Sequence, residues 1–236
     1  MKIFGKNAVV EALKSNQVVN NVVVSASLPT AILQNIEFLC KKRNIKLQKL
    51  AKTEFNAQHP ENTQGIVAFV QDFNYTELEE LLDAEDVFLV LLDGVEDPHN
   101  LGAIIRVAEC AGATGIVIPK NRSVQVNETV ARVSAGALSH VKIARVGNLH
   151  DAIDKIKDSG AFVYAADMDG ENMYQTNLEG KIAVVIGGEG KGVSALSRKK
   201  ADGVVSIPMF GKVNSLNASV SAGIVLYEVV RQRRGE

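Results

Sequence analysis

The chain has 236 residues, 46% of them hydrophobic and 22% charged, which is the composition of a globular protein with one or two domains. A formal net charge of −1 argues against an unusually strong nonspecific binder of polyanions. No apolar run approaches the roughly 20 residues of a membrane span, and the N-terminus lacks a signal-peptide pattern, so we expect a cytoplasmic protein with no membrane partner.

The charge is unevenly distributed along the chain. Residues 1–74 carry 9 Lys and Arg against 5 Asp and Glu, whereas the remainder carries 17 against 22. The basic residues of the first part include a cluster that could face phosphates, although such runs are more often simply solvated: Lys41, Lys42, Arg43, Lys46, Lys49 and Lys52.

The two cysteines follow no metal-ligand spacing. Cys40 and Cys110 lie far apart within helical apolar patterns, so we expect two buried free thiols, no disulfide framework and no metal.

Residues 1–74 read as a small α/β unit. Apolar periodicity predicts a helix at 7–14, a strand at 22–24, a helix at 31–43 and strands at 46–50 and 65–70. Residues 75–86 are acidic, carry leucines at helical spacing and lie between strands, so we place the domain junction there.

Strands and helices alternate from residue 87 onward, which predicts a parallel sheet wrapped by helices. The expected strands are 87–92, 115–118, 141–146, 162–166, 182–186 and 204–207. One expected helix begins near residue 100, and the others span 128–138, 149–157 and 220–230.

Three polar loops follow strands of this predicted sheet. The first begins at Asp93 and leads into the helix that carries Arg106, the second is the glycine-rich 187–192, and the third is the stretch 206–219 that opens into the last helix. In parallel sheets such loops hold ligands, and four glycines around Glu189 suggest close approach of backbone to a ligand. A structural interpretation also exists, in which Asp97 or Asn100, and one of Ser215, Asn217 and Ser219, only cap helices.

Residues 190–195 also fit the dinucleotide pattern G-x-G-x-x-G/A. That pattern requires an acidic residue about 20 positions further on, at the end of the next strand, whereas Asp202 precedes its strand. A dinucleotide-binding enzyme is therefore disfavoured.

The order and residue types of the three loops resemble the motifs of the SpoU (TrmH) family of RNA ribose 2′-O-methyltransferases. The first motif is Asp97-Pro98-x-Asn100-x-Gly102-x-x-x-Arg106, the second is Gly187-x-Glu189-Gly190-x-Gly192, and the third joins Ile207-Pro208-Met209 to Ser215-Leu216-Asn217-Ala218-Ser219. Residues 1–71, with Phe4-Gly5 and Gln64-Gly65-Ile66, are similar to the substrate-binding domain of family members that methylate a guanosine of 23S rRNA.

The resemblance implies an RNA-binding domain with a ribosomal-protein-like fold at 1–71, an acidic linker at 72–86 and a SPOUT methyltransferase domain with a deep trefoil knot at 87–236. It also implies S-adenosylmethionine as the cofactor and a homodimer with the active site near its interface. The implied catalytic residues are Asn100, Arg106, Glu189, Ser215 and Asn217. The implied cofactor-binding residues are Gly187, Gly188, Ile207, Met209 and Leu216.

By this resemblance the substrate is a guanosine ribose of 23S rRNA. Related enzymes modify the D-loop of tRNA, which is the alternative substrate, and a noncatalytic RNA-binding module is a more distant alternative. Arg106 is implied to contact an RNA phosphate and to help deprotonate the ribose hydroxyl. A guanidinium keeps its proton in proteins, so either the neighbouring phosphate is arranged unusually or Arg106 acts through charge and orientation alone.

Overall fold

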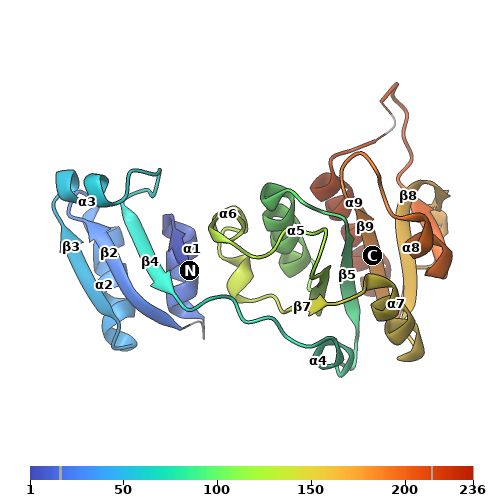
Figure 1. The fold of residues 1–236 in the computed structure, drawn as a ribbon, viewed down its shortest axis with the longest axis horizontal. Coiled ribbons are helices and arrows are strands. Elements are labelled where there is room, and N and C mark those ends of the chain that lie inside the picture. The colour runs from blue at the N-terminus through green and yellow to red at the C-terminus, as the bar shows by residue number, and fades with distance from the viewer. Residues whose placement is uncertain (16–17, 214, 236) are drawn as a thin grey trace. The chain divides into compact units, whose positions relative to one another are not determined.

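The computed structural model describes residues 1–15, 18–213 and 215–235, which form two compact units (Figure 1). The first unit consists of Met1–Asn74 together with Val126–His140, and the second consists of Tyr75–Gln125 together with Val141–Glu236. None of the described helices is long and apolar enough to cross a membrane.

The first unit is built on a four-stranded sheet with the order β1-β4-β2-β3. Strand β4 runs antiparallel to β1 and β2, whereas β2 and β3 are parallel. The elements are β1 (Lys2–Phe4), α1 (Lys6–Lys14), β2 (Val19–Ser25), α2 (Thr30–Lys42), β3 (Lys46–Leu50), α3 (Lys52–Gln58), β4 (Ile66–Val70), α6 (Glu128–Val133) and the 3-10 helix η1 (Ala137–Ser139).

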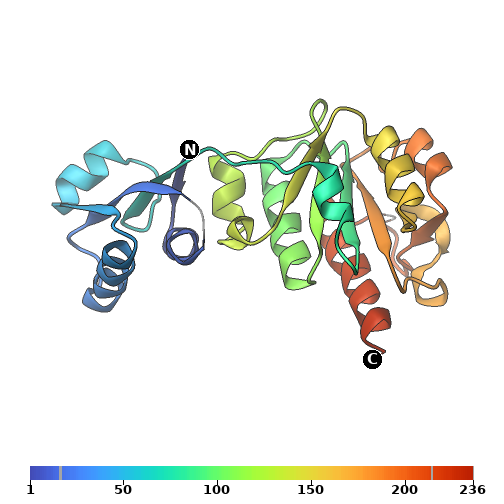
Figure 2. The ribbon, with the colours of Figure 1, turned by 90° about the horizontal axis from the view of Figure 1, so that it is seen from below.

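Helices cover both faces of this sheet, with α1 and α2 on one side and α3 on the other (Figure 2). On the α3 side, Phe55 is fully buried against Val23 and Val67. Alternate residues of the same strands, among them Val22 and Ala68, are also fully buried, because successive side chains of a strand point to opposite faces. The α/β character predicted for residues 1–74 is therefore present.

Helix α6 is shorter than the predicted helix 128–138. The chain leaves the helix at Ala135 and Gly136, whose φ angles are 53° and 101°. A Cβ on Gly136 would lie 2.6 Å from the side chain of Glu11, so this position accommodates α1 only because it is glycine. The end of α6 is thus determined by a tertiary contact that helical periodicity does not report.

The second unit is a six-stranded sheet with the order β10-β8-β9-β5-β6-β7, in which every neighbouring pair is parallel. The prediction of a parallel sheet is confirmed. Its strands are β5 (Phe88–Asp93), β6 (Gly115–Pro119), β7 (Ile143–Val146), β8 (Phe162–Asn172), β9 (Ile182–Gly187) and β10 (Gly203–Ser206). Its helices are α4 (Leu78–Leu82), α5 (Pro98–Cys110), α7 (Leu149–Asp158), the 3-10 helix η2 (Met173–Gln175), α8 (Ala195–Lys200) and α9 (Ala218–Arg234).

Both faces of the second sheet are buried, which explains the continuous apolar runs of its central strands. Leu89 and Leu91 of β5 pack in one core cluster with Leu81 of α4 and Ile153 of α7. Helices α5 and α9 pack against each other and cover the opposite face (Figures 1 and 2). The acidic segment 75–86 therefore contributes α4, and with it Leu81, to the core of this unit.

The two thiols differ in environment. Cys40 of α2 is buried, and the loss of solvation raises its pKa to about 11. Cys110 at the end of α5 is exposed, so the prediction of two buried thiols is wrong for this residue. Its position in the last turn of α5 places it outside the apolar stripe formed by Leu101, Ile104 and Ala108.

Candidate active site

The first motif lies between the end of β5 and the start of α5. The chain turns at Gly94, where φ is 79°, and α5 then begins at Pro98, a residue that suits the first turn because it lacks an N–H. The Asp97 side chain caps the helix by accepting a hydrogen bond from the His99 N–H at 2.9 Å. Asn100 therefore faces inward from the first turn and is only 5% exposed.

The second motif follows β9 and packs directly on the first. The Gly188 N–H donates to the Asp93 carbonyl at 2.9 Å, and the Asp93 carboxylate accepts a hydrogen bond from the Ser194 N–H at 2.9 Å. A Cβ on Gly188 would lie 1.9 Å from the carbonyl oxygen of Gly94, and one on Gly187 would lie 2.1 Å from the backbone of Gly192. Close approach of backbone to backbone therefore requires both glycines, and this packing supports Glu189.

The third motif ends at the N-terminus of α9, where Asn217 is the cap. Its side-chain oxygen accepts from the N–H of Ser219 at 2.9 Å and from that of Val220 at 3.4 Å. The Ser219 hydroxyl donates to the same oxygen at 2.6 Å. Among the three capping candidates predicted from the sequence, Asn217 is the one whose side chain caps the helix.

The three motifs meet through three side chains. The Asn100 amide nitrogen donates to Glu189 Oε1 at 2.9 Å. The Asn217 amide nitrogen donates to the same Glu189 oxygen and to the Asn100 side-chain oxygen, at 2.9 Å in each case. We call these three side chains the amide–carboxylate cluster.

The amide–carboxylate cluster orients one charged acceptor. Two amide N–H groups hold Glu189 Oε1, while the other carboxylate oxygen has no hydrogen-bond partner within the described part of the chain. Glu189 is exposed, so this second oxygen is accessible to donors of a bound molecule. The arrangement can accept a hydrogen bond from a hydroxyl or an amino group at a defined place.

Arg106 and Ser215 lie outside the amide–carboxylate cluster. Arg106 is six residues beyond Asn100 on the same helix, which places it about 9 Å further along the axis and about 240° around it. It is exposed, and within residues 1–15, 18–213 and 215–235 its guanidinium makes no hydrogen bond or ion pair. Ser215 is also exposed, in the loop between β10 and α9.

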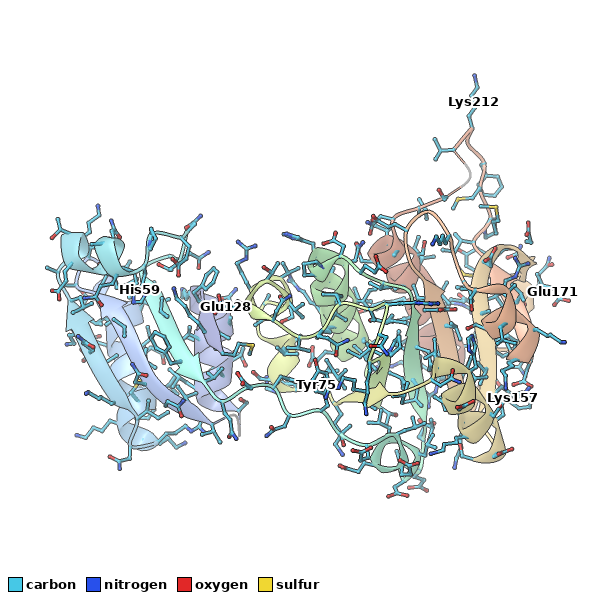
Figure 3. The ribbon with its side chains drawn as sticks, in the orientation of Figure 1. His59, Tyr75, Glu128, Lys157, Glu171 and Lys212 are labelled. Carbon is cyan, nitrogen blue, oxygen red and sulfur yellow. The ribbon has the colours of Figure 1, made fainter. Side chains whose placement is uncertain are left out.

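Apolar side chains flank the same loop. Ile207 is half-buried just after β10, and Met209 and Leu216 are 39% and 40% exposed. Figure 3 shows this loop extending from the second unit, with Lys212 at its outer end. An adenosyl group needs apolar contacts together with a few polar groups, and these three side chains can supply the apolar contacts. Within the described residues, no group of His, Cys, Asp and Glu side chains could hold a metal ion.

Asp93 and Ser194, whose hydrogen bond joins the first two loops, lie outside the three motifs. A carboxylate at the end of a buried central strand is a usable signal, because such an end lies at the ligand edge of a parallel sheet. No sequence signal connects that carboxylate with a partner 101 positions away.

Two family descriptions match most of the chain. The SpoU rRNA Methylase family matches residues 87–227. The family of RNA 2′-O ribose methyltransferase substrate-binding domains matches residues 2–76. Asn100, Glu189 and Asn217 lie within the first of these matches.

Similar proteins support the same assignment. A protein of Bacillus subtilis named as a TrmH family tRNA/rRNA methyltransferase, YacO, is 40% identical over 98% of this chain and 95% of its own length. Among solved structures, the SpoU methyltransferase AviRb of Streptomyces viridochromogenes in complex with AdoMet has a TM-score of 0.86 and 25% identity, covering 100% of this chain and 91% of its own. The TrmH/SpoU tRNA-modifying enzyme of A. aeolicus has a TM-score of 0.58 and 29% identity, covering 67% of this chain and 81% of its own. The chain therefore belongs to the SpoU (TrmH) family of RNA methyltransferases.

Proposed function

We propose that the protein transfers the methyl group of S-adenosylmethionine to the ribose 2′-hydroxyl of a guanosine in 23S rRNA. The observation that carries this proposal is the amide–carboxylate cluster, in which Asn100, Glu189 and Asn217 come from three different loops of a SpoU family chain. The AviRb structure, which covers this chain and contains AdoMet, supports the choice of cofactor.

The cofactor supplies an activated methyl group on a sulfonium, and its departure leaves a neutral thioether. The protein therefore needs no oxyanion hole. Its residues must align the hydroxyl and leave an acceptor for the proton that the hydroxyl loses, for which the second Glu189 oxygen or solvent is available. We assign Glu189 the role of accepting a hydrogen bond from the bound substrate or cofactor, because one of its oxygens has no partner among the described residues. Asn100 and Asn217 hold that carboxylate in place, and Ser215 lies two residues before Asn217 in the third loop.

Arg106 has a different role in this proposal. A permanently charged, exposed guanidinium suits an RNA phosphate, which it can hold with two hydrogen bonds. By binding the phosphate next to the target ribose, Arg106 would set the position of the hydroxyl without accepting its proton. We therefore assign Arg106 orientation and charge rather than base catalysis.

We also propose a homodimer through α5 and α9, because α9 is apolar on two sides. Its buried side packs on the sheet, while Val220 and Tyr227 are 48% and 51% exposed. Val107 of α5 lies beside Gly223 of α9, so the two helices form one continuous surface. A second copy on this surface would place the exposed Arg106 at the interface.

The alternative substrate is tRNA, and the A. aeolicus enzyme favours it because that protein is described as tRNA modifying. That enzyme matches only 67% of this chain, whereas a substrate-binding domain family matches residues 2–76 here. The additional domain favours a large structured RNA over tRNA, because a second RNA-binding surface selects among extended substrates.

The test is methylation by purified protein of 23S rRNA and, separately, of bulk tRNA, with labelled S-adenosylmethionine. A 2′-O-methyl group blocks alkaline cleavage at one phosphodiester, so we expect one alkali-resistant dinucleotide that contains guanosine from 23S rRNA. Label in tRNA alone would select the alternative substrate, and label on a base would contradict ribose chemistry. For the dimer, sedimentation of Tyr227→Glu should show monomers, and an unchanged dimer would contradict the α5–α9 interface.

A further inference from the structure

Helix α2 of the first unit has an unusual outer face. Ile36 and Cys40 are buried against the sheet, as expected for an amphipathic helix. The opposite side carries Phe38, which is 64% exposed, more than any other aromatic side chain described in this unit. An exposed phenylalanine alone is not informative, because single surface hydrophobics are normal.

The neighbours of Phe38 make its exposure informative. Residues three and four apart are adjacent on a helix, so Lys41 and Lys42 lie one turn after Phe38, and Gln34 and Asn35 one turn before it. All four are exposed. We call the five side chains the α2 strip, which combines an aromatic ring, two cations and two amides.

The structure separates the basic residues of this region into two groups. Lys49 pairs with Glu37, and the Arg43 guanidinium donates to the backbone carbonyls of Ala12 and Leu13. In the described part of the chain, the ammonium groups of Lys41 and Lys42 make no hydrogen bond or ion pair within the protein. Cations near a helix C-terminus are favoured by the helix dipole, which explains why Lys41 and Lys42 lie in the last turn of α2. It does not explain why the Phe38 ring beside them is exposed.

We propose that the α2 strip binds an unpaired nucleotide of the substrate RNA, with Phe38 stacked on the base and Lys41 and Lys42 on its flanking phosphates. Stacking on an aromatic side chain together with cations along the backbone is how proteins hold single-stranded RNA. A protein partner fits less well, because amides and lysines surround the ring and leave no continuous apolar surface. The inference deepens the proposed function, since it rests on an RNA substrate.

The first test is equilibrium binding without cofactor, using two labelled RNA probes of equal length: a hairpin with an unpaired loop and a blunt duplex. Phe38→Ala should weaken hairpin binding by roughly 5- to 150-fold, the measured range for one stacked base, and should leave the salt dependence unchanged. Lys41→Ala with Lys42→Ala should instead lower the slope of log affinity against log salt by about 1.4 for two phosphate contacts on a single strand. Duplex binding should respond to the lysines and not to Phe38.

The matched control is Phe162→Ala, which removes a ring that is 58% exposed in the second unit. This variant should bind the hairpin like the wild type. Equal losses for Phe38→Ala and Phe162→Ala would overturn the proposal. A change in sedimentation of Phe38→Ala without a change in RNA affinity would identify the α2 strip as a contact between protein chains and would also overturn it.

The second test uses the absence of tryptophan from the sequence. Phe38→Trp keeps a stacking ring and introduces a single indole fluorophore, so we expect wild-type hairpin affinity and quenching of the fluorescence on binding. Phe162→Trp should show no quenching. An unquenched Phe38→Trp protein that binds the hairpin would refute stacking, even if Phe38→Ala proved unstable.

These measurements separate the inference from the proposed function. Hairpin binding is measured without S-adenosylmethionine, and cofactor affinity is measured on the same preparations. If no RNA is methylated while the α2 strip behaves as expected, only the proposed function fails. If RNA is methylated and the Phe38 and lysine variants bind it normally, only the α2 strip is refuted.

Discussion

Asn217 performs two separable tasks, and substitutions can remove them one at a time. Its oxygen caps α9, and its amide nitrogen donates to Asn100 and Glu189. Asn217→Ser keeps a capping oxygen and removes the amide donor. Asn217→Asp also keeps the cap, but it places a second carboxylate about where the 2.9 Å amide contact to Glu189 now lies. Asn217→Ala removes both the capping oxygen and the amide donor.

The stability changes follow from these contacts. Loss of a helix cap costs about 1 kcal/mol, so Asn217→Ala should lower the free energy of unfolding by that amount plus the loss of the two amide hydrogen bonds. These bonds contribute about 1 kcal/mol or less each, because Asn217 and Glu189 are solvent-exposed. A total of about 2 kcal/mol corresponds to a melting temperature lower by roughly 4–8 °C in a chain of this size. Asn217→Ser should lose only the contribution of the two amide hydrogen bonds to the free energy of unfolding.

The order of the variants in methylation activity should differ from their order in stability. Asn217→Ser leaves Glu189 without one of its two amide donors, so we expect methylation to fall on the order of 10²-fold, the effect of misplaced catalytic groups. Asn217→Asp should be the least active, because repulsion displaces Glu189, although its cap is intact. Single-turnover methylation at saturating RNA, measured with thermal melts of each variant, separates chemistry from stability. An Asn217→Ser enzyme with the wild-type rate would refute the role of the amide–carboxylate cluster.

Further substitutions test other parts of the structure. Gly188→Ala should destabilise the protein by about 1–3 kcal/mol because its Cβ would meet the Gly94 carbonyl, whereas Gly190→Ala, with open space and a φ of 80°, should cost only about 1 kcal/mol; equal urea midpoints for the two variants would contradict this. His59 lies in the first unit (Figure 3). Burial lowers its pKa in the folded state, so the unfolded chain binds the proton more readily. Stability should therefore be intact above the ordinary value of 6.5 and should fall as pH decreases below it, and His59→Leu should flatten this decline in denaturant titrations. Arg106→Lys should retain S-adenosylmethionine affinity and lose methylation on the order of 10²-fold or more, because lysine cannot hold a phosphate with two parallel bonds; a near wild-type single-turnover rate would show that charge alone suffices.

The predicted central strands agree with the structure to within one residue. Strands 87–92 and 182–186 were expected from continuous apolar runs, and β5 and β9 occupy Phe88–Asp93 and Ile182–Gly187. A strand buried on both faces has an apolar residue at every position, so its pattern needs no knowledge of its neighbours.

Short elements were not predicted. Strand β1 consists of Lys2–Phe4 and exists through pairing with β4, more than 60 positions away. Helices α3 and α8, at Lys52–Gln58 and Ala195–Lys200, are too short to give a reliable periodic signal. Isolated helices of this length are marginal in water, so the tertiary structure stabilises them rather than local propensity.

The domain boundaries and the trefoil knot remain predictions, and so do the roles of the individual site residues. The structure brings together only some of the implied catalytic residues, because Asn100, Glu189 and Asn217 are in contact. Arg106 lies on another side of α5 from Asn100, and Ser215 is exposed in its loop. A motif reports which residues are present. It does not report the direction in which each side chain points.

The sequence by itself determined the parallel α/β architecture, the positions of the three polar loops and the set of residues able to cap the last helix. These properties depend on local periodicity and residue chemistry. Only the tertiary structure decided that Asn217 meets Asn100 across 117 positions, that Gly188 is required by a carbonyl of another loop, and that Phe38 faces solvent beside two lysines. The physical reason is that strand order and register in a parallel sheet bring distant loops to one edge, and this placement depends on the whole fold rather than on any single segment.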